Sequence, residues 1–496
     1  QLWSTRGMHY FTLEVTMKKT INIFLFTLLV RCILAQGAGE LINTWADDNQ
    51  WKHAHVGFAL HEVKSGKMMA GYNHDKGFVP ASSLKLISSL TAWEVLGANY
   101  TFKTVLAYDG TLTDSVLTGN VYLIGSGDPS LGSKRFEEKL NFSELPNYLA
   151  GKVKAAGIKT ITGNLFCDES IFDSFPISPS WQWNDLGSGY ASGAWGININ
   201  ENEYEIWYNS QAEPGNAAEI LTVTPDIPNL ILQNEVTIDA ENSGDNAFIF
   251  GGPYTYEKRI VGTIPKSKQA FRIKGSIPHP PHFLASAIHH QLTHYGISCG
   301  EAKVISTPTL HPPLTGIDTV SSMPLKDLVR AANHHSLNMY CEAFLKTLGL
   351  KSGSRGSGSE GIALIEKSLT EKGFDITPIH LEDGSGLSAR NYVSPAILSG
   401  FLAQFVLKNS PATTTYLLPE AGSEGTVRRL LKNSPAKGHV WMKSGSLNKI
   451  MSYTGLIEAK NKEWYTFSVM VNGYTQSSSQ ARQAIEKLIS DLYQKL

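Results

Sequence analysis

Cysteine is scarce in this sequence: the four in 496 residues, Cys32, Cys167, Cys299 and Cys341, lie far apart. No Cys-x-x-Cys pair is present, so the sequence gives no support for a thiolate zinc site or a dithiol redox centre. If Cys32 is removed with the leader described below, three cysteines remain. An odd number of distant cysteines favours ordinary buried thiols over the alternative of one disulfide and a free thiol.

An excess of charge of one sign is also lacking. Lys and Arg number 43 and Asp and Glu 44, which gives a formal net charge of -1. A nucleic-acid-binding protein usually carries a basic face or stripe, so this class is disfavoured. No P-loop, no strand-linked Gly-x-Gly-x-x-Gly and no His-Glu-x-x-His pattern occurs, so neither a nucleotide cofactor nor a metal is predicted.

No apolar run reaches the roughly 20 residues that a transmembrane helix needs. The run over 21–30 is shorter, follows Lys18 and Lys19, and is followed by a small residue, Ala35. These are the parts of a secretory signal peptide, so residues 1–36 are interpreted as an upstream extension and signal. Arg31 interrupts the apolar region and leaves an uncleaved anchor open as the alternative. The sequence therefore predicts export, to the periplasm or cell envelope of a bacterium.

What the sequence does contain is apolar content for large cores, with 42% hydrophobic and 18% charged residues. At roughly 100–200 residues per domain, the length predicts two to four domains. The first and last parts show helix periods and antiparallel strands, whereas residues 101–308 show short strands with one clear helix over 283–295. The fold class is therefore α+β, with one domain interrupted by a long insertion. The predicted elements of the outer parts are strands 56–63, 68–72, 440–442, 453–459 and 464–471, a helix from 84 that Gly97 ends, and a final helix over 481–492.

One Ser-x-x-Lys pair, Ser82 and Lys85, lies at the start of a predicted helix. A spacing of three places both side chains on one helical face, so the amine can reach the hydroxyl. A lysine with the ordinary pKa of about 10.4 cannot activate a serine unless burial or a nearby cation lowers that pKa. The ordinary alternative is a helix cap followed by a solvated lysine.

A Lys-Ser-Gly pattern at Lys443, Ser444 and Gly445 follows a predicted strand and continues to Ser446. An edge strand of this kind can pair with an extended peptide, while Lys443 and Ser444 bind a carboxylate. Gly445 would let the substrate backbone approach closely. The Lys-Ser-Gly patterns that begin at 64 and 351 are better explained as turns.

Together with Ser336-x-Asn338, these motifs resemble those of the penicillin-binding and serine β-lactamase superfamily. The long stretch between the first two motifs resembles the D-alanyl-D-alanine carboxypeptidase/endopeptidase family of class C low-molecular-mass penicillin-binding proteins, peptidase family S13. Further stretches that resemble this family are 80–82, 125–129, 183–185, 383–388 and 425–429. The third motif departs from the family pattern in having Ser444 where threonine is common.

The resemblance implies a penicillin-binding/serine β-lactamase-like transpeptidase domain, an antiparallel sheet flanked by helices, interrupted by inserted mostly-β domains. We expect the catalytic domain at 37–100 and 309–496, an inserted domain II at 101–204 and 276–308, and a nested domain III at 205–275.

The resemblance also implies a serine-type D-Ala-D-Ala carboxypeptidase, a D,D-endopeptidase, or both, acting on peptidoglycan stem peptides and acylated by β-lactam antibiotics. The resemblance implies that Ser82 is the nucleophile and Lys85 the base. It implies that Ser336 relays a proton to the leaving amine, that Asn338 holds the substrate amide, and that Lys443 is the cation that lowers the pKa of Lys85. Ser444 and Gly445 are the implied substrate-binding residues, and the backbone N–H groups of Ser82 and Ser446 are the implied oxyanion hole. The alternatives are a β-lactamase or esterase on the same fold and a non-catalytic wall-binding scaffold.

Overall fold

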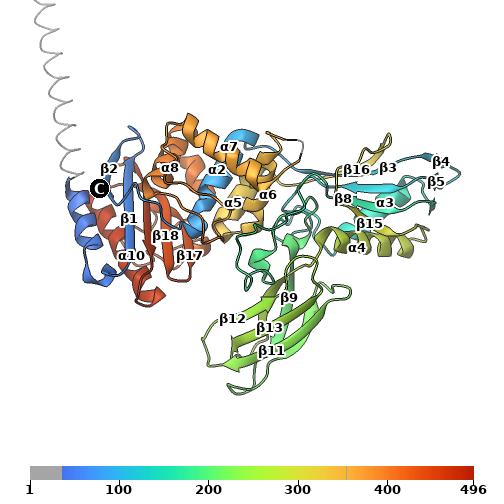
Figure 1. Ribbon diagram of the computed structural model, residues 1–496, viewed down its shortest axis with the longest axis horizontal. Helices are drawn as coiled ribbons and strands as arrows, with labels where there is room; N and C mark the ends of the chain where they lie inside the picture. The colour runs from blue at the N-terminus through green and yellow to red at the C-terminus, as the bar shows by residue number, and fades with distance from the viewer. Residues whose placement is uncertain (1–35, 354) are drawn as a thin grey trace, which may run out of the picture.

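The computed structural model describes residues 36–353 and 355–496 (Figure 1). The predicted leader, Gln36 apart, lies outside the described residues. Within them, no helix is long and apolar enough to cross a membrane. The cysteines Cys167 and Cys341 are buried free thiols and Cys299 is a half-buried one, which confirms for these three the interpretation as ordinary cysteines.

A five-stranded antiparallel sheet is assembled from the two ends of the chain, in the order β17-β18-β19-β1-β2. Its members are β1 (His55–Glu62), β2 (Met68–Tyr72), β17 (Val440–Leu447), β18 (Ile450–Glu458) and β19 (Trp464–Asn472). The first and last segments meet in the middle, where His55 of β1 lies opposite Asn472 of β19. The predicted strands are thus confirmed, and β17 lies at an edge of the sheet.

Helices cover both faces of this sheet, so its central strands are buried along almost their whole length. On one face, the helix over 36–46 and α10 (Ser478–Lys495) share a core with Phe58 and Phe467. On the other face, Leu456 and Met470 share a core with a group of helices. That group comprises α2 (Lys85–Leu96), α5 (Leu325–His335), α6 (Asn338–Gly349), α7 (Gly358–Glu371), α8 (Pro395–Asn409) and α9 (Pro411–Leu417).

The inserted region, residues 101–321, lies beside the part of the molecule built on this sheet (Figure 1), and it has a core of its own. One five-stranded sheet, β15-β8-β6-β3-β16, and a small sheet, β4-β5-β7, lie beside two helices. The bounds are β3 (Lys103–Tyr108), β4 (Thr111–Thr113), β5 (Val116–Thr118), β6 (Val121–Ile124), α3 (Leu145–Ala155), β7 (Thr160–Ile161), β8 (Leu165–Asp168), α4 (Pro280–His294), β15 (Ala302–Ile305) and β16 (Thr315–Ser321). The helix α4 was expected from the sequence, and α3 was not.

Two three-stranded sheets, β10-β9-β14 and β11-β13-β12, form a unit within the inserted region that projects to one side (Figure 1). Their strands are β9 (Glu203–Asn209), β10 (Glu219–Thr224), β11 (Ile231–Asp239), β12 (Asn246–Phe250), β13 (Glu257–Pro265) and β14 (Phe271–Ser276). The domain boundaries stay a prediction. One strand does not fit the predicted boundaries. The catalytic domain was expected to resume at 309, but β16, which lies beyond that residue, pairs with β3 of the inserted region.

Candidate active site

Ser82 lies where a short 3-10 turn, η2 (Ala81–Leu84), runs directly into α2. The residue before it, Ala81, has a positive φ of 46°, a backbone conformation that is uncommon for residues other than glycine. The Nζ of Lys85 donates a hydrogen bond of 2.8 Å to the Oγ of Ser82. The contact expected from the spacing of three is therefore present, and Lys85 is not a solvated lysine.

Lys85 is completely buried, and its ammonium nitrogen has three hydrogen-bond acceptors. Besides the hydroxyl of Ser82, these are Asn338 Oδ1 at 2.6 Å and the main-chain oxygen of Ser385 at 2.6 Å. An ammonium group has three N–H donors, so each donor has a partner. Burial lowers the pKa of Lys85 from its ordinary value, although the carboxyl groups of Asp383 and Glu342 act in the opposite direction.

The second predicted motif joins two helices. Ser336 is the last residue of the turn at the end of α5 and has a positive φ of 58°, and Asn338 begins α6. The two side chains therefore point to different lysines. Ser336 Oγ accepts a hydrogen bond of 2.9 Å from Lys443, whereas Asn338 Oδ1 accepts one from Lys85. The Nδ2 of Asn338 donates to the main-chain oxygen of Tyr190 at 2.8 Å.

Lys443 lies in the edge strand β17 and is completely buried. Its Nζ donates to Ser336 Oγ and, at 2.7 Å, to the main-chain oxygen of Ser444. Burial, followed by repulsion from Lys85, lowers the pKa of Lys443 well below its ordinary value. The sequence interpretation gave Lys443 the role of lowering the pKa of Lys85, whereas burial is the largest cause for both groups.

The rest of the third motif continues along β17, which runs on to Leu447 rather than ending before the motif. Ser444 and Ser446 are accessible, and Ser444 Oγ lies 2.7 Å from Thr426 Oγ1. Gly445 is buried, and a Cβ atom there would lie 2.3 Å from Ser452 Oγ, 2.7 Å from the main-chain oxygen of Pro80 and 2.8 Å from the backbone nitrogen of Ser82. Glycine therefore lets β17 approach the turn that holds Ser82, and the expected approach of a substrate backbone stays a prediction.

Three partners in this site were not assigned from the sequence: the main-chain oxygens of Tyr190 and Ser385, and the hydroxyl of Thr426. Backbone acceptors leave no side-chain signal. Ser385 and Thr426 lie in the stretches 383–388 and 425–429, which resemble the same family as the motifs do. That resemblance was the only sequence signal that these two residues belong to the site.

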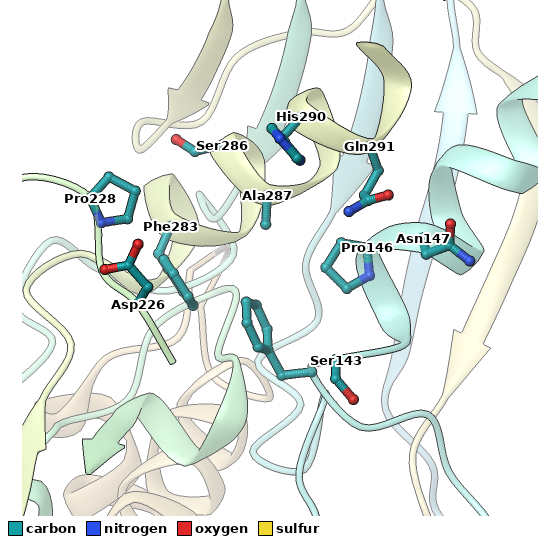
Figure 2. Close-up of a pocket in the computed structure, with 11 residues that line it drawn as sticks. Ser143, Pro146, Asn147, Asp226, Pro228, Phe283, Ser286, Ala287, His290 and Gln291 are labelled. Atoms are coloured by element: carbon teal, nitrogen blue, oxygen red, sulfur yellow. The ribbon is translucent and has the colours of Figure 1, made fainter. Parts of the chain in front are cut away.

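A polar cavity of about 190 Å³ opens beside Ser336 and Asn338. Its opposite wall comes from the inserted region and includes Arg135 and Glu201, which form an ion pair of 2.5 Å. A different pocket lies between α3 and α4 (Figure 2), where Phe142 and Phe283 stack with ring centroids 4.8 Å apart. None of the predicted site residues lines that pocket.

The fold is similar to that of a penicillin-binding protein of known structure. The structure of penicillin binding protein 4 (dacB) from Haemophilus influenzae matches with a TM-score of 0.76 and 24% identity, covering 90% of this chain and 96% of that one. The same protein complexed with a β-lactam matches with a TM-score of 0.71 and 21% identity, covering 90% and 98%.

Residues 39–494 match the model of the D-Ala-D-Ala carboxypeptidase 3 (S13) family, and the chain belongs to this family. A curated relative, the D-alanyl-D-alanine carboxypeptidase of Actinomadura sp. (strain R39), is 23% identical over 448 residues, which cover 88% of this chain and 81% of the relative. The resemblance inferred from the motifs is thereby confirmed. The expected activity, that of a serine-type D-Ala-D-Ala carboxypeptidase, is the activity for which the family is named.

Proposed function

We propose that this chain hydrolyses D-Ala-D-Ala bonds, or the amide of a peptide cross-link, in peptidoglycan stem peptides through an acyl-enzyme on Ser82. The observation that carries the proposal is the pair of completely buried lysines, each hydrogen-bonded to a serine hydroxyl: Lys85 to Ser82 and Lys443 to Ser336. A scaffold that only bound the wall would have no use for two buried amines directed at hydroxyl groups.

In acylation, Lys85 in its neutral form takes the proton of Ser82 Oγ, which lies 2.8 Å away, as that oxygen attacks the scissile carbonyl. Burial favours the neutral amine by lowering its pKa. The backbone N–H groups of Ser82 and Ser446 stabilise the developing oxyanion, where one such donor typically contributes about 10²–10³ in rate.

Collapse of the tetrahedral intermediate breaks the carbon–nitrogen bond, and the leaving amine needs a proton. Ser336 donates its hydroxyl proton to that amine, and Lys443, which lies 2.9 Å from Ser336 Oγ, returns a proton to the serine. Lys85 then releases to solvent the proton that it took from Ser82, and Lys443 recovers one from solvent, so both amines return to their starting states. Water attacks the ester on Ser82 and passes a proton to Lys85, which gives it to Ser82 Oγ as the carbon–oxygen bond breaks, so the acid leaves and the free hydroxyl is restored.

Recognition of the substrate would use the edge of β17 and the start of α6. The accessible Ser444, with Lys443 behind it, binds the terminal carboxylate, and Asn338 holds the substrate amide. The cavity lined by Arg135 and Glu201 supplies charged groups for the rest of a stem peptide. We further propose the domain division given above, action outside the cytoplasmic membrane after export, and covalent inhibition by β-lactam antibiotics, in keeping with the β-lactam bound to the similar structure.

The test is the intact mass of the protein after incubation with benzylpenicillin, compared with that of Ser82→Ala. We expect a gain of one penicilloyl group in the wild type and none in the variant. Release of D-alanine from a stem pentapeptide and cleavage of a cross-linked dimer, measured side by side, then separate carboxypeptidase from endopeptidase activity.

Other outcomes favour the alternatives. Rapid loss of the drug without a stable adduct would identify a β-lactamase. No adduct and no loss of drug would overturn the acyl-enzyme proposal, and glycan binding that survives in Ser82→Ala but is lost when 101–308 is deleted would favour the scaffold.

A further inference from the structure

A loop formed by residues 383–388 lies directly behind the first motif. The main-chain oxygen of Ser385 accepts the 2.6 Å hydrogen bond from Lys85, and that of Gly384 accepts one of 2.6 Å from the hydroxyl of Ser88, one turn further along α2. A Cβ atom on Gly386, which has a φ of +78°, would lie 1.9 Å from the main-chain oxygen of Ala81. The loop therefore contacts both the proposed base and the backbone just before the nucleophile.

One buried carboxylate holds the conformation of this loop. Asp383 is 1% exposed, and its two oxygens accept four hydrogen bonds. The backbone N–H groups of Gly386 and Ser388 each donate at 2.7 Å, and Asn391 Nδ2 donates at 2.9 Å. The fourth donor is the indole N–H of Trp181, at 2.8 Å. Three of the donors belong to residues close in sequence, and Trp181 does not.

Trp181 belongs to the inserted region and is 6% exposed. Two serines next to it contact the same stretch: Ser178 Oγ donates to the main-chain oxygen of Glu382 at 3.0 Å, and Ser180 Oγ donates to Ser388 Oγ at 2.8 Å. The segment 178–181 thus contacts the loop at two points and the residue just before it, Glu382, at a third. The inserted region is joined here to the part of the chain that holds Lys85.

We propose that Trp181 is a positioning residue for acylation: its indole N–H fixes the Asp383 carboxylate, and the loop over 383–388 then holds the amine of Lys85 against Ser82. The inference rests on the proposed function of Ser82 and Lys85. A lysine side chain is long and flexible, so its amine stays at one point only where acceptors are fixed around it. Loss of such alignment, by as little as about 1 Å, can lower a rate about 10²-fold.

The pH dependence of acylation gives an independent test of this role, because charged groups surround Lys85. Asp383, Glu342 and Cys341 raise the pKa of Lys85 against the larger effect of burial, and Lys443 is the cation beside it. Removing the charge of Asp383 lowers that pKa further, so the neutral amine persists to lower pH. A defect that only unfolds part of the protein would change the fraction of active molecules without moving the pH profile.

The experiment measures the rate constant for acylation by benzylpenicillin, per active site counted from the adduct, in the full chain. Trp181→Phe removes the indole donor and keeps an aromatic ring. The matched control is Trp45→Phe, because the indole of Trp45 is 9% exposed and donates at 3.0 Å to the main-chain oxygen of Ala484, on the other face of the catalytic sheet. We expect a decrease of about tenfold or more in Trp181→Phe and the wild-type rate constant in the control.

The second variant is Asp383→Asn, followed across pH. We expect its rate constant to fall and the acidic limb of its profile to move to lower pH, while the limb of Trp181→Phe stays near that of the wild type. Wild-type rate constants per active site in both variants would overturn the inference and leave the proposed function intact. The absence of an adduct in the wild type itself would instead be a failure of the proposed function.

Discussion

Two regions of the molecule bury lysines in different ways. Among residues 36–353 and 355–496, four lysines are buried, and the nested unit holds one of them, Lys258 of β13. Its Nζ donates to the main-chain oxygens of Gly251 and Gly252, at 2.6 and 3.0 Å, and burial lowers its pKa to about 8. At the catalytic sheet, Lys85 and Lys443 are equally buried but donate to serine hydroxyls.

On the proposed function, burial and a lowered pKa do not by themselves make an amine reactive. The carbonyl groups that surround Lys258 have no proton to give, so its nitrogen can only hold a turn in place. The hydroxyl groups beside Lys85 and Lys443 do have protons, and Ser82 is partly accessible from solvent. What distinguishes the sites is therefore the partner of the amine.

The largest effect is expected from Lys85→Met, with Lys258→Met as the matched change in the nested unit. Because positioned proton transfer typically contributes about 10²–10⁴ in rate, Lys85→Met should lower the benzylpenicillin acylation rate constant by that factor. Lys258→Met should leave it unchanged. Rates measured by intact mass over time check both variants, and an equal loss in the two would contradict the distinction between the partners.

A smaller effect, on stability, is expected at the fourth buried lysine. Lys346 of α6 pairs with Asp173 at 2.9 Å and also donates to the main-chain oxygens of Phe175 and Ala194. Because its removal leaves a half-buried carboxylate without its cation and two carbonyls without this donor, Lys346→Met should lower the free energy of unfolding by about 2–4 kcal/mol. Denaturant unfolding measures this loss. The acylation rate constant of the folded variant should stay near that of the wild type.

The third expectation concerns pH and Lys258. Between about pH 8 and the ordinary lysine pKa of about 10.4, the unfolded chain keeps this proton and the folded protein does not. The free energy of unfolding of the wild type should therefore rise with pH across this window relative to Lys258→Met, by up to about 3 kcal/mol. Unfolding at pH 7.5 and pH 10 in both proteins provides the test, and the absence of a relative rise would show that Lys258 stays charged in the folded protein.

The smallest effect is expected from moving Ser82 relative to Lys85 without touching either amine. A Cβ on Gly445 would press on the backbone nitrogen of Ser82, so Gly445→Ala should lower the acylation rate constant by about tenfold. Gly316→Ala is the control, because no atom lies within 4 Å of a Cβ there. If Gly445→Ala acylates like the wild type, the spacing between β17 and η2 does not matter for the reaction.

Much of the catalytic domain could be predicted from the sequence, because its elements have clear local signals. Strands β1 and β19 carry apolar runs, and α2 ends where Gly97 takes a φ of 89°. The helix α3 has only 11 residues and lies among turn-forming residues, so its period was easy to miss. The pairing of β16 with β3 depends on residues distant in sequence and had no local signal.

For the site, the side chains could be predicted and their backbone partners could not. The spacing of Ser82 and Lys85 indicated a contact that the structure contains. The main-chain carbonyl of Ser385 accepts a hydrogen bond from the same lysine. Every residue type has such a carbonyl, so the sequence gives no signal for this contact. Gly445 was predicted to bind substrate, whereas its close contacts with Pro80 and Ser82 join residues far apart in sequence and had no local signal.

The pairing of β1 with β19 also sets an order of events during synthesis. Ser82 and Lys85 emerge from the ribosome well before Lys443 and the strands β17, β18 and β19. Until those strands arrive, β1 and β2 have no sheet to join, and the inserted region, with a core of its own, can fold first. The part of the site that holds Ser82 and Lys85 therefore stays unassembled during translation until β17, β18 and β19 have been made.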